Sequence, residues 1–224
     1  MTTTEYKLYI DTIIRRIEAA RIKRSPHHIV KLVAVSKYST TQEIKELYAI
    51  GQRAFGENKV QDLEKKAKEL EEYPIEWHFI GNLQKNKINK LLDISPALFQ
   101  GLDSLELAYE LQKRLALREM QLDALLQINA AKEESKHGVM PENAKEIYEK
   151  IQKECPNINL KGVMSIGAHS DDKEKIKESF LTTHKIFTEL EGATICSMGM
   201  SGDFELAIEC GSTMVRLGSL LFNK

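Results

Sequence analysis

Short apolar runs alternate with longer amphipathic stretches along most of this chain. Eight apolar runs are strand candidates, at residues 31–36, 53–56, 76–80, 97–100, 122–128, 160–164, 193–196 and 213–217. Helical patterns follow the first seven runs, at residues 41–50, 59–72, 85–92, 104–119, 142–154, 173–190 and 204–209. Buried parallel strands have this continuous apolar character and need helical crossovers between them. The pattern therefore predicts an α/β fold, a single (β/α)8 TIM barrel, with a doubly wound open sheet as the alternative.

A further helix is predicted before the first strand. Residues 4–24 carry apolar side chains at helical spacing and charged side chains on the other face, and Pro26 ends the pattern. The apolar positions are Tyr6, Ile10, Ile13, Ile14, Ile17 and Ala20. We expect this helix to pack on the barrel and not on a membrane, because its polar face carries acids as well as bases. No linker or composition shift divides the chain, which predicts one domain over residues 1–224.

Composition and charge exclude several classes of protein. The 32 Lys and Arg residues nearly balance the 33 Asp and Glu residues, so the chain lacks the basic excess typical of nucleic-acid binding. The three cysteines show no CxxC spacing and the histidines no HxxxH pair, which argues against a disulfide framework and predicts no metal site. No start resembling a signal peptide and no run of about 18 apolar residues occurs, so we expect a cytoplasmic protein without membrane contact.

Active sites of such barrels lie at the carboxyl ends of the strands, so the residues after each run are the site candidates. Lys37 follows the first run directly. An apolar barrel mouth around its stem would desolvate the amine and make it a nucleophile suited to Schiff-base formation. The alternative is an ordinary lysine that extends to solvent from a strand end.

The loops after the last two runs form the second candidate feature. Residues 197–203 are rich in Gly and Ser and precede a helix, so their amides and the Ser201 hydroxyl can form an anion cradle. An ordinary turn capped by Ser201 or Asp203 is the alternative. Loops after strands 7 and 8 are the usual phosphate site of these barrels.

The end of the last run adds Arg216, Gly218 and Ser219. A guanidinium only donates hydrogen bonds, so Arg216 suits a phosphate or an aromatic nitrogen, although pairing with Glu57 is equally open. A nucleophilic lysine facing a phosphate cradle indicates a phosphorylated aldehyde as ligand, either a cofactor or a sugar phosphate.

Other candidates carry weaker signals. His78 could face a ligand, but a single His in an apolar strand is more often a hydrogen-bonded core residue. Asn58 and Asn82 could bind ligand oxygens or cap helices. Met164 could pack on a flat ring or fill the core. The charged helix at 59–72 is predicted to be a solvated outer face.

Seven blocks of this sequence match a known family in order, at residues 32–37, 55–58, 77–87, 135–138, 162–164, 197–203 and 211–218. The chain resembles the pyridoxal 5′-phosphate (PLP) homeostasis proteins, also called the proline synthetase co-transcribed family. The blocks Trp-His-Phe-Ile-Gly at 77–81 and Ser-Met-Gly-Met-Ser at 197–201 are specific. The resemblance implies a fold like the N-terminal barrel of alanine racemase without its C-terminal β domain.

The resemblance also assigns roles to the candidate residues. It implies an aldimine between PLP and Lys37, a phosphate site at Ser201, Gly218 and Ser219, and Arg216 near the pyridine nitrogen. An arginine there keeps that nitrogen unprotonated and weakens the ring as an electron sink. We add Asn58 and Met164 to the predicted cofactor contacts.

The function implied is that of a cytoplasmic PLP carrier without established catalytic turnover, which supplies PLP-dependent apo-enzymes and acts as a monomer. Two departures from the family pattern leave roles open: the loop 129–135 beside Lys136, a suspected second PLP contact, and the end of the chain after Phe222. A PLP-dependent racemase is the alternative, but no tyrosine has an evident claim to be its second base. A cofactor-free aldolase using Lys37 is the third hypothesis.

Overall fold

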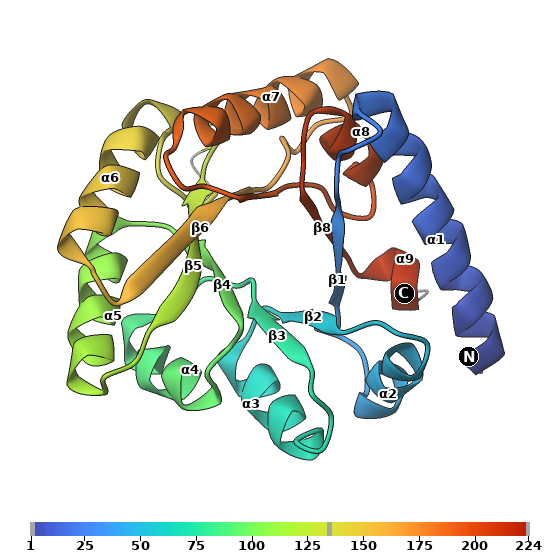
Figure 1. The fold of residues 1–224 in the computed structure, drawn as a ribbon, viewed down its shortest axis with the longest axis horizontal. Coiled ribbons are helices and arrows are strands. Elements are labelled where there is room, and N and C mark those ends of the chain that lie inside the picture. Colours follow the sequence, from blue (N-terminus) through green and yellow to red (C-terminus); the bar gives the residue numbers. More distant parts are fainter. Residues whose placement is uncertain (1–2, 134–135, 223–224) are drawn as a thin grey trace.

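Eight parallel strands close into a barrel in the order of the chain (Figure 1). The computed structural model describes residues 3–133 and 136–222. The strands are β1 (Lys31–Val35), β2 (Ala54–Glu57), β3 (Glu76–Phe79), β4 (Leu98–Leu102), β5 (Leu122–Ile128), β6 (Ile158–Ser165), β7 (Ile195–Ser197) and β8 (Met214–Leu217). Residues 31–34 of β1 pair in parallel with residues 214–217 of β8, which seals the ring. The predicted TIM barrel is confirmed, and the open sheet is excluded.

Helices surround the barrel (Figure 1). They are α1 (Thr3–Arg24), α2 (Thr41–Ala49), α3 (Val60–Glu69), α4 (Ile88–Ile94), α5 (Leu105–Leu117), α6 (Ala144–Glu154), α7 (Lys173–Glu189), α8 (Phe204–Glu209) and α9 (Ser219–Phe222), with 3-10 turns at Lys85–Lys87 and Pro141–Asn143. All seven predicted crossover helices are present. The sequence pattern did not predict α9, because its four residues are too few to show a helical period. No helix in the described part of the chain is both long and apolar enough to cross a membrane.

The extra helix α1 lies outside the barrel and packs mainly against α8 (Figure 1). Five of its six predicted core positions are buried, but Ile14 is 45% exposed. The prediction for Ile14 is wrong because this residue lies about 100° around the helix from the buried Ile13. Arg16 stabilises the contact between the two helices. Its Nε lies 2.7 Å from Glu205 Oε1, and its Cζ lies 4.8 Å from the centre of the Phe204 ring.

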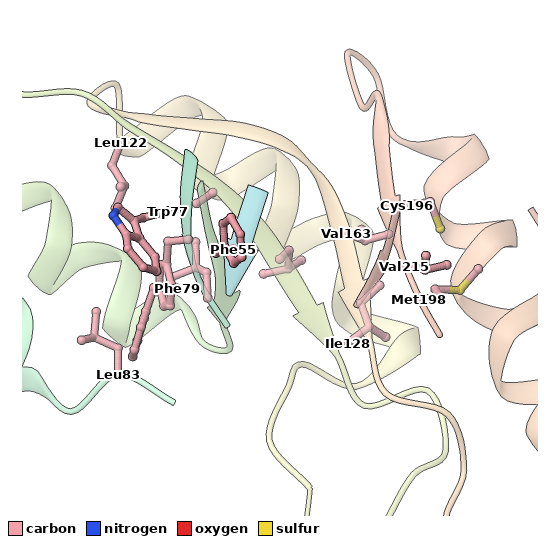
Figure 2. Packing of buried hydrophobic residues seen from close by; sticks show 14 of the residues in the cluster. Phe55, Trp77, Phe79, Leu83, Leu122, Ile128, Val163, Cys196, Met198 and Val215 are labelled. Carbon is pink, nitrogen blue, oxygen red and sulfur yellow. The ribbon is translucent and has the colours of Figure 1, made fainter. Parts of the chain in front are cut away.

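The apolar core has two layers. The larger layer lies between the barrel and the helices, and Figure 2 shows Phe55, Trp77 and Phe79 gathered there. A small inner cluster fills the barrel itself, formed by Val33, Ala54, Leu98, Leu125, Met164 and Met214. Because successive strand residues point to opposite faces, each strand contributes to both layers. Buried polar side chains also occur on the strands, among them His78, Gln100 and Arg216.

A glycine in β6 allows the barrel strands to approach closely. Gly162 has a φ of 143°, and a Cβ added there would lie 2.0 Å from the carbonyl oxygen of Ile195 on β7. The pairing register of β5 and β6 shifts between Ala124 and Leu125, the latter being paired with Gly162. Only glycine adopts this backbone conformation readily, so residue 162 determines the local geometry of three strands.

Candidate functional site

A cavity of about 510 Å³ opens at the carboxyl ends of β1 and β8. Its lining includes five of the seven predicted cofactor residues: Lys37, Ser201, Arg216, Gly218 and Ser219. They come from the loop after β1, the loop after β7, β8 itself, the residue between β8 and α9, and α9. The closure of the barrel between β8 and β1 therefore brings together residues that are far apart in sequence.

Lys37 lies in the turn after β1 and is exposed. The prediction of a stem buried in an apolar mouth is wrong. The strand ends at Val35, the buried Ser36 follows, and Lys37 is the first residue of the turn, so its side chain extends from the rim. Its Nζ lies 5.1 Å from the centre of the Tyr38 ring, within the range of a cation–π contact. Tyr38, which follows Lys37 after the first strand and so lies among the strand-end candidates, also lines the cavity.

A buried ion pair lies beneath this turn, between the barrel and α3. Lys66 Nζ donates to Glu57 Oε1 at 2.7 Å and to the carbonyl oxygen of Ser36 at 2.6 Å. The Ser36 hydroxyl donates to the same Glu57 oxygen at 2.6 Å. Since the Ser36 carbonyl belongs to the peptide bond that leads into Lys37, the pair holds the start of the turn.

This pair corrects two sequence interpretations. Glu57 is fully buried and faces Lys66, so the open alternative in which Glu57 pairs with Arg216 is wrong. Lys66 is only 9% exposed, so the prediction that the charged residues of the helix at 59–72 form a solvated face is wrong for this lysine. The spacing contained the signal, because Lys66 shares one helix face with the buried residues Val60 and Leu63.

Arg216 projects from β8 and is 4% exposed. Its NH1 donates to the carbonyl oxygen of Ser197 at 2.9 Å and to the Ser197 hydroxyl at 2.7 Å, while NH2 donates to the carbonyl oxygen of Ser165 at 2.8 Å. Burial lowers the pKa of Arg216 to about 10, and the charge of Asp203 opposes this shift. The guanidinium thus stays protonated at neutral pH.

The hydrogen bonds of Arg216 leave donors for a ligand. Its three side-chain hydrogen bonds go to oxygens of Ser197 and Ser165, so three of its five N–H groups are used. Because Arg216 lines the cavity, the two other N–H groups suit a hydrogen-bond acceptor placed there.

The loops after β7 and β8 are joined around one hydroxyl. Ser201 Oγ accepts hydrogen bonds from the amides of Gly218 at 3.3 Å and Leu220 at 3.4 Å. A Cβ added to Gly202 would meet no atom within 4 Å, so this backbone faces open space. The hydroxyls of Ser201 and Ser219 therefore supply donors to this space, beside the Gly218 and Leu220 amides that donate to Ser201 Oγ, and this chemistry suits a phosphate.

Two predicted contacts lie elsewhere. Asn58 lines a separate cavity of about 180 Å³ together with Asn82. Met164 is 1% exposed and belongs to the inner core cluster. Neither lines the cavity that contains Lys37, and their contacts with a cofactor remain predictions.

The loop around Lys136 borders the site without lining the same cavity. Lys136 Nζ donates to Glu133 Oε1 at 2.9 Å and to the carbonyl oxygen of Gly167 at 2.8 Å. Its cavity, of about 410 Å³, shares Met200 and Gly202 with the first one. Residue 135 of the matching block at 135–138 lies outside the described residues.

Comparison with known proteins agrees with this geometry. The sequence profile of the family described as "Alanine racemase, N-terminal domain" matches residues 10–223. The pyridoxal phosphate homeostasis protein of Helicobacter pylori is 54% identical over 220 residues, which cover 98% of this chain and 99% of that protein. The chain belongs to the pyridoxal phosphate homeostasis family, within the alanine racemase N-terminal domain fold. This membership confirms the resemblance seen in the sequence.

Two solved structures of similar proteins share the fold. One, an unknown protein from Bifidobacterium adolescentis, has a TM-score of 0.90 and 32% identity and covers 98% of this chain and 95% of its own. The other, PipY of Synechococcus elongatus solved with PLP bound, has a TM-score of 0.80 and 30% identity, over 93% of this chain and 98% of its own. The family fold thus matches the whole barrel.

Proposed function

We propose that this protein binds PLP in the cavity between β1 and β8 and acts as a PLP carrier that supplies apo-enzymes. One observation carries the proposal: a primary amine, a buried guanidinium with unused donors, and a cradle of hydroxyls and amides line a single cavity. The names of the H. pylori relative and of the PLP-bound PipY structure support it.

The residues present fit the three functional groups of PLP. Lys37 supplies an amine for the aldehyde, Arg216 supplies donors for the pyridine nitrogen, and Ser201, Gly218 and Ser219 supply donors for the phosphate. When bound, PLP provides an aldehyde that reacts reversibly with a primary amine and releases one water. A cavity of about 510 Å³ lies within the usual range for small-molecule sites.

Two features of the site favour a carrier over an enzyme. Arg216 can only donate to the pyridine nitrogen, and a nitrogen held unprotonated makes the ring a weak electron sink. Lys37 is exposed at the rim, so an amine from outside can reach the aldehyde bound there. Tyr38 adjoins Lys37 in the same turn and does not supply a base on a separate element, as a racemase would need.

The first test is covalent binding of PLP at Lys37. Protein purified with PLP is expected to show a visible absorbance band that Lys37→Ala abolishes, and borohydride reduction should attach the cofactor to Lys37 in a peptide mass spectrum. Lys65→Ala is the matched control, since Lys65 is 76% exposed and lies on α3. The assignment is contradicted if Lys37→Ala keeps the absorbance band, or if borohydride reduction attaches PLP to a different lysine.

The second test separates carrier from enzyme. The loaded protein is mixed with a PLP-dependent apo-enzyme and a scavenger of free PLP, and the enzyme should regain activity despite the scavenger. Racemisation of alanine, followed by chiral chromatography, is expected to stay at the level of free PLP. Turnover above that level would replace the carrier proposal by the racemase.

The carrier is further proposed to act as a monomer in a reducing, cytoplasmic setting. All five cavity residues described above come from one chain, as a monomeric carrier requires. The three cysteines are free thiols, and all are buried. Light scattering of the PLP-bound protein at micromolar concentration tests the monomer, and a dimeric mass would contradict it.

A further inference from the structure

A chain of hydrogen bonds runs through the barrel interior from Arg216 to the opposite end. Ser197 Oγ, which accepts from Arg216, donates to Gln100 Oε1 at 2.7 Å. Gln100 Nε2 lies 2.9 Å from His78 Nδ1, and His78 Nε2 lies 2.9 Å from Glu76 Oε1. Ser197, Gln100 and His78 are fully buried. The chain crosses from β8 and β7 to β4 and β3.

The chain ends at the amino-terminal side of the barrel. Lys31, the first residue of β1, donates to the same Glu76 oxygen that faces His78. The side chain of Glu76 is 36% exposed there, beside a second cavity of about 520 Å³. The charged groups of the chain thus lie at its two ends, with Arg216 at one end and Glu76 with its partner Lys31 at the other.

Glu76, which only accepts, and Arg216, which only donates, together determine the direction of the bonds in the chain. A carboxylate only accepts, so His78 Nε2 carries the proton and Nδ1 is left as an acceptor. Nδ1 therefore receives the Gln100 amide N–H, and the Gln100 oxygen is free to accept from Ser197. The Ser197 hydroxyl then presents a lone pair to Arg216. Burial lowers the pKa of His78, which keeps the imidazole neutral and preserves this order.

We propose that His78 and Gln100 are positioning residues for the cofactor site: they fix the Ser197 hydroxyl as an acceptor and so orient Arg216 toward the bound ligand. The backbone oxygens of Ser197 and Ser165 hold two further N–H groups, but only the hydroxyl bond depends on a side chain that can rotate. This inference rests on the proposed PLP site. It means that His78, in the 77–81 block, acts on that site through Gln100 and Ser197 and does not contact the ligand.

Three variants test the chain. His78→Leu removes the acceptor at Nδ1, whereas His78→Asn, although smaller and without a group that reaches Glu76, places an amide oxygen that only accepts near the Nδ1 position. Gln100→Met breaks the middle link and serves if His78→Leu fails to fold. Leu98→Ala, in the same inner cluster, controls for lost stability alone.

The readouts are the Kd for PLP, the absorbance maximum of bound PLP, and the imidazole 15N spectrum of the apo-protein. We expect His78→Leu and Gln100→Met to raise the Kd about tenfold and to shift the absorbance maximum, since one charge-assisted hydrogen bond loses its geometry. His78→Asn and Leu98→Ala should stay near wild type. The apo-protein spectrum should show the Nε2–H tautomer at His78.

The outcomes separate the two proposals. Wild-type affinity and spectrum in His78→Leu and Gln100→Met would refute the positioning role and leave the PLP site intact. Equal losses in Leu98→Ala, or in His78→Asn, would also refute it, because stability or shape would then explain the effect. An Nδ1–H tautomer in the apo-protein would refute the chain without reference to PLP. A wild-type protein that does not bind PLP would refute the proposed function itself.

Discussion

The buried pair of Glu57 and Lys66 allows a prediction with a defined magnitude. Glu57 is fully buried, its Oε1 accepts from Lys66 and Ser36, and its Oε2 has no hydrogen-bond partner in the described residues. Lys66→Met therefore leaves a buried carboxylate with only the Ser36 hydroxyl. Breaking a buried pair from one side costs about 3–5 kcal/mol, a large share of a typical stability of about 5–15 kcal/mol.

The double variant Glu57→Leu/Lys66→Met removes both charges. Replacing a buried pair by apolar residues is often neutral, so most of the lost stability should return. The coupling between the two positions is then about 3 kcal/mol in a double-mutant cycle measured by urea unfolding. The double variant still lacks the donor to the Ser36 carbonyl, so PLP binding at Lys37 should stay weakened after stability has returned.

Lys65→Met is the control for this cycle. Lys65 precedes Lys66 on α3 but is 76% exposed and lies 3.9 Å from Glu69, so its loss should cost no more than about 0.5 kcal/mol. A cost below about 1 kcal/mol for Lys66→Met, or a double variant less stable than the single one, would refute the argument from the buried charge. Full recovery of PLP binding in the double variant would show that the pair does not hold the Lys37 turn.

Three further predictions concern the barrel itself. Gly162→Ala is expected to destabilise the protein by several kcal/mol in urea unfolding, since its Cβ would lie 2.0 Å from the Ile195 oxygen; a cost near zero would contradict this close approach. The pKa of Glu76 is lowered to about 2 by its bonds to His78 and Lys31, so its contribution is present above its ordinary pKa of 4.5 and is lost as the pH falls toward 2. Glu76→Gln should therefore flatten the loss of stability over this pH range, and an unchanged pH profile would refute the assignment. Burial raises the pKa of the Cys196 thiol to about 12, so Cys196 should react with Ellman's reagent only at the rate of unfolding, and fast labelling of the native protein would show that it is accessible.

The sequence pattern predicted the barrel because each apolar run and each helix is a local signal. The location of Lys37, Ser201 and Arg216 at one end followed from the rule that parallel strands present their carboxyl ends together. The exposure of Lys37 could not be predicted, since it depends on the strand ending two residues earlier. The helical spacing places Lys66 on the buried face of α3, but the pattern of charges along the sequence does not identify its partner Glu57 on β2.

The interior hydrogen bonds were beyond sequence reasoning for a related reason. His78 was expected to be a hydrogen-bonded core residue, and it is one. Its partner Gln100 comes from another strand, and the link from Gln100 to Ser197 spans 97 positions in sequence. Only the closure of the ring determines which inward-facing polar side chains meet.

The seam between β1 and β8 also has a consequence for the order of events during folding. Lys37 is synthesised well before Arg216, Gly218 and Ser219, because it precedes them along the chain. No partly closed barrel holds the cavity, because β8 must first pair with β1. A ligand that binds only the sealed ring stabilises it by about 2.7 kcal/mol at a hundred times its Kd. The concentration of PLP in the cell would thereby set the stability of the pairing between β1 and β8. The lifetime of the folded protein would then rise and fall with the amount of PLP available to it.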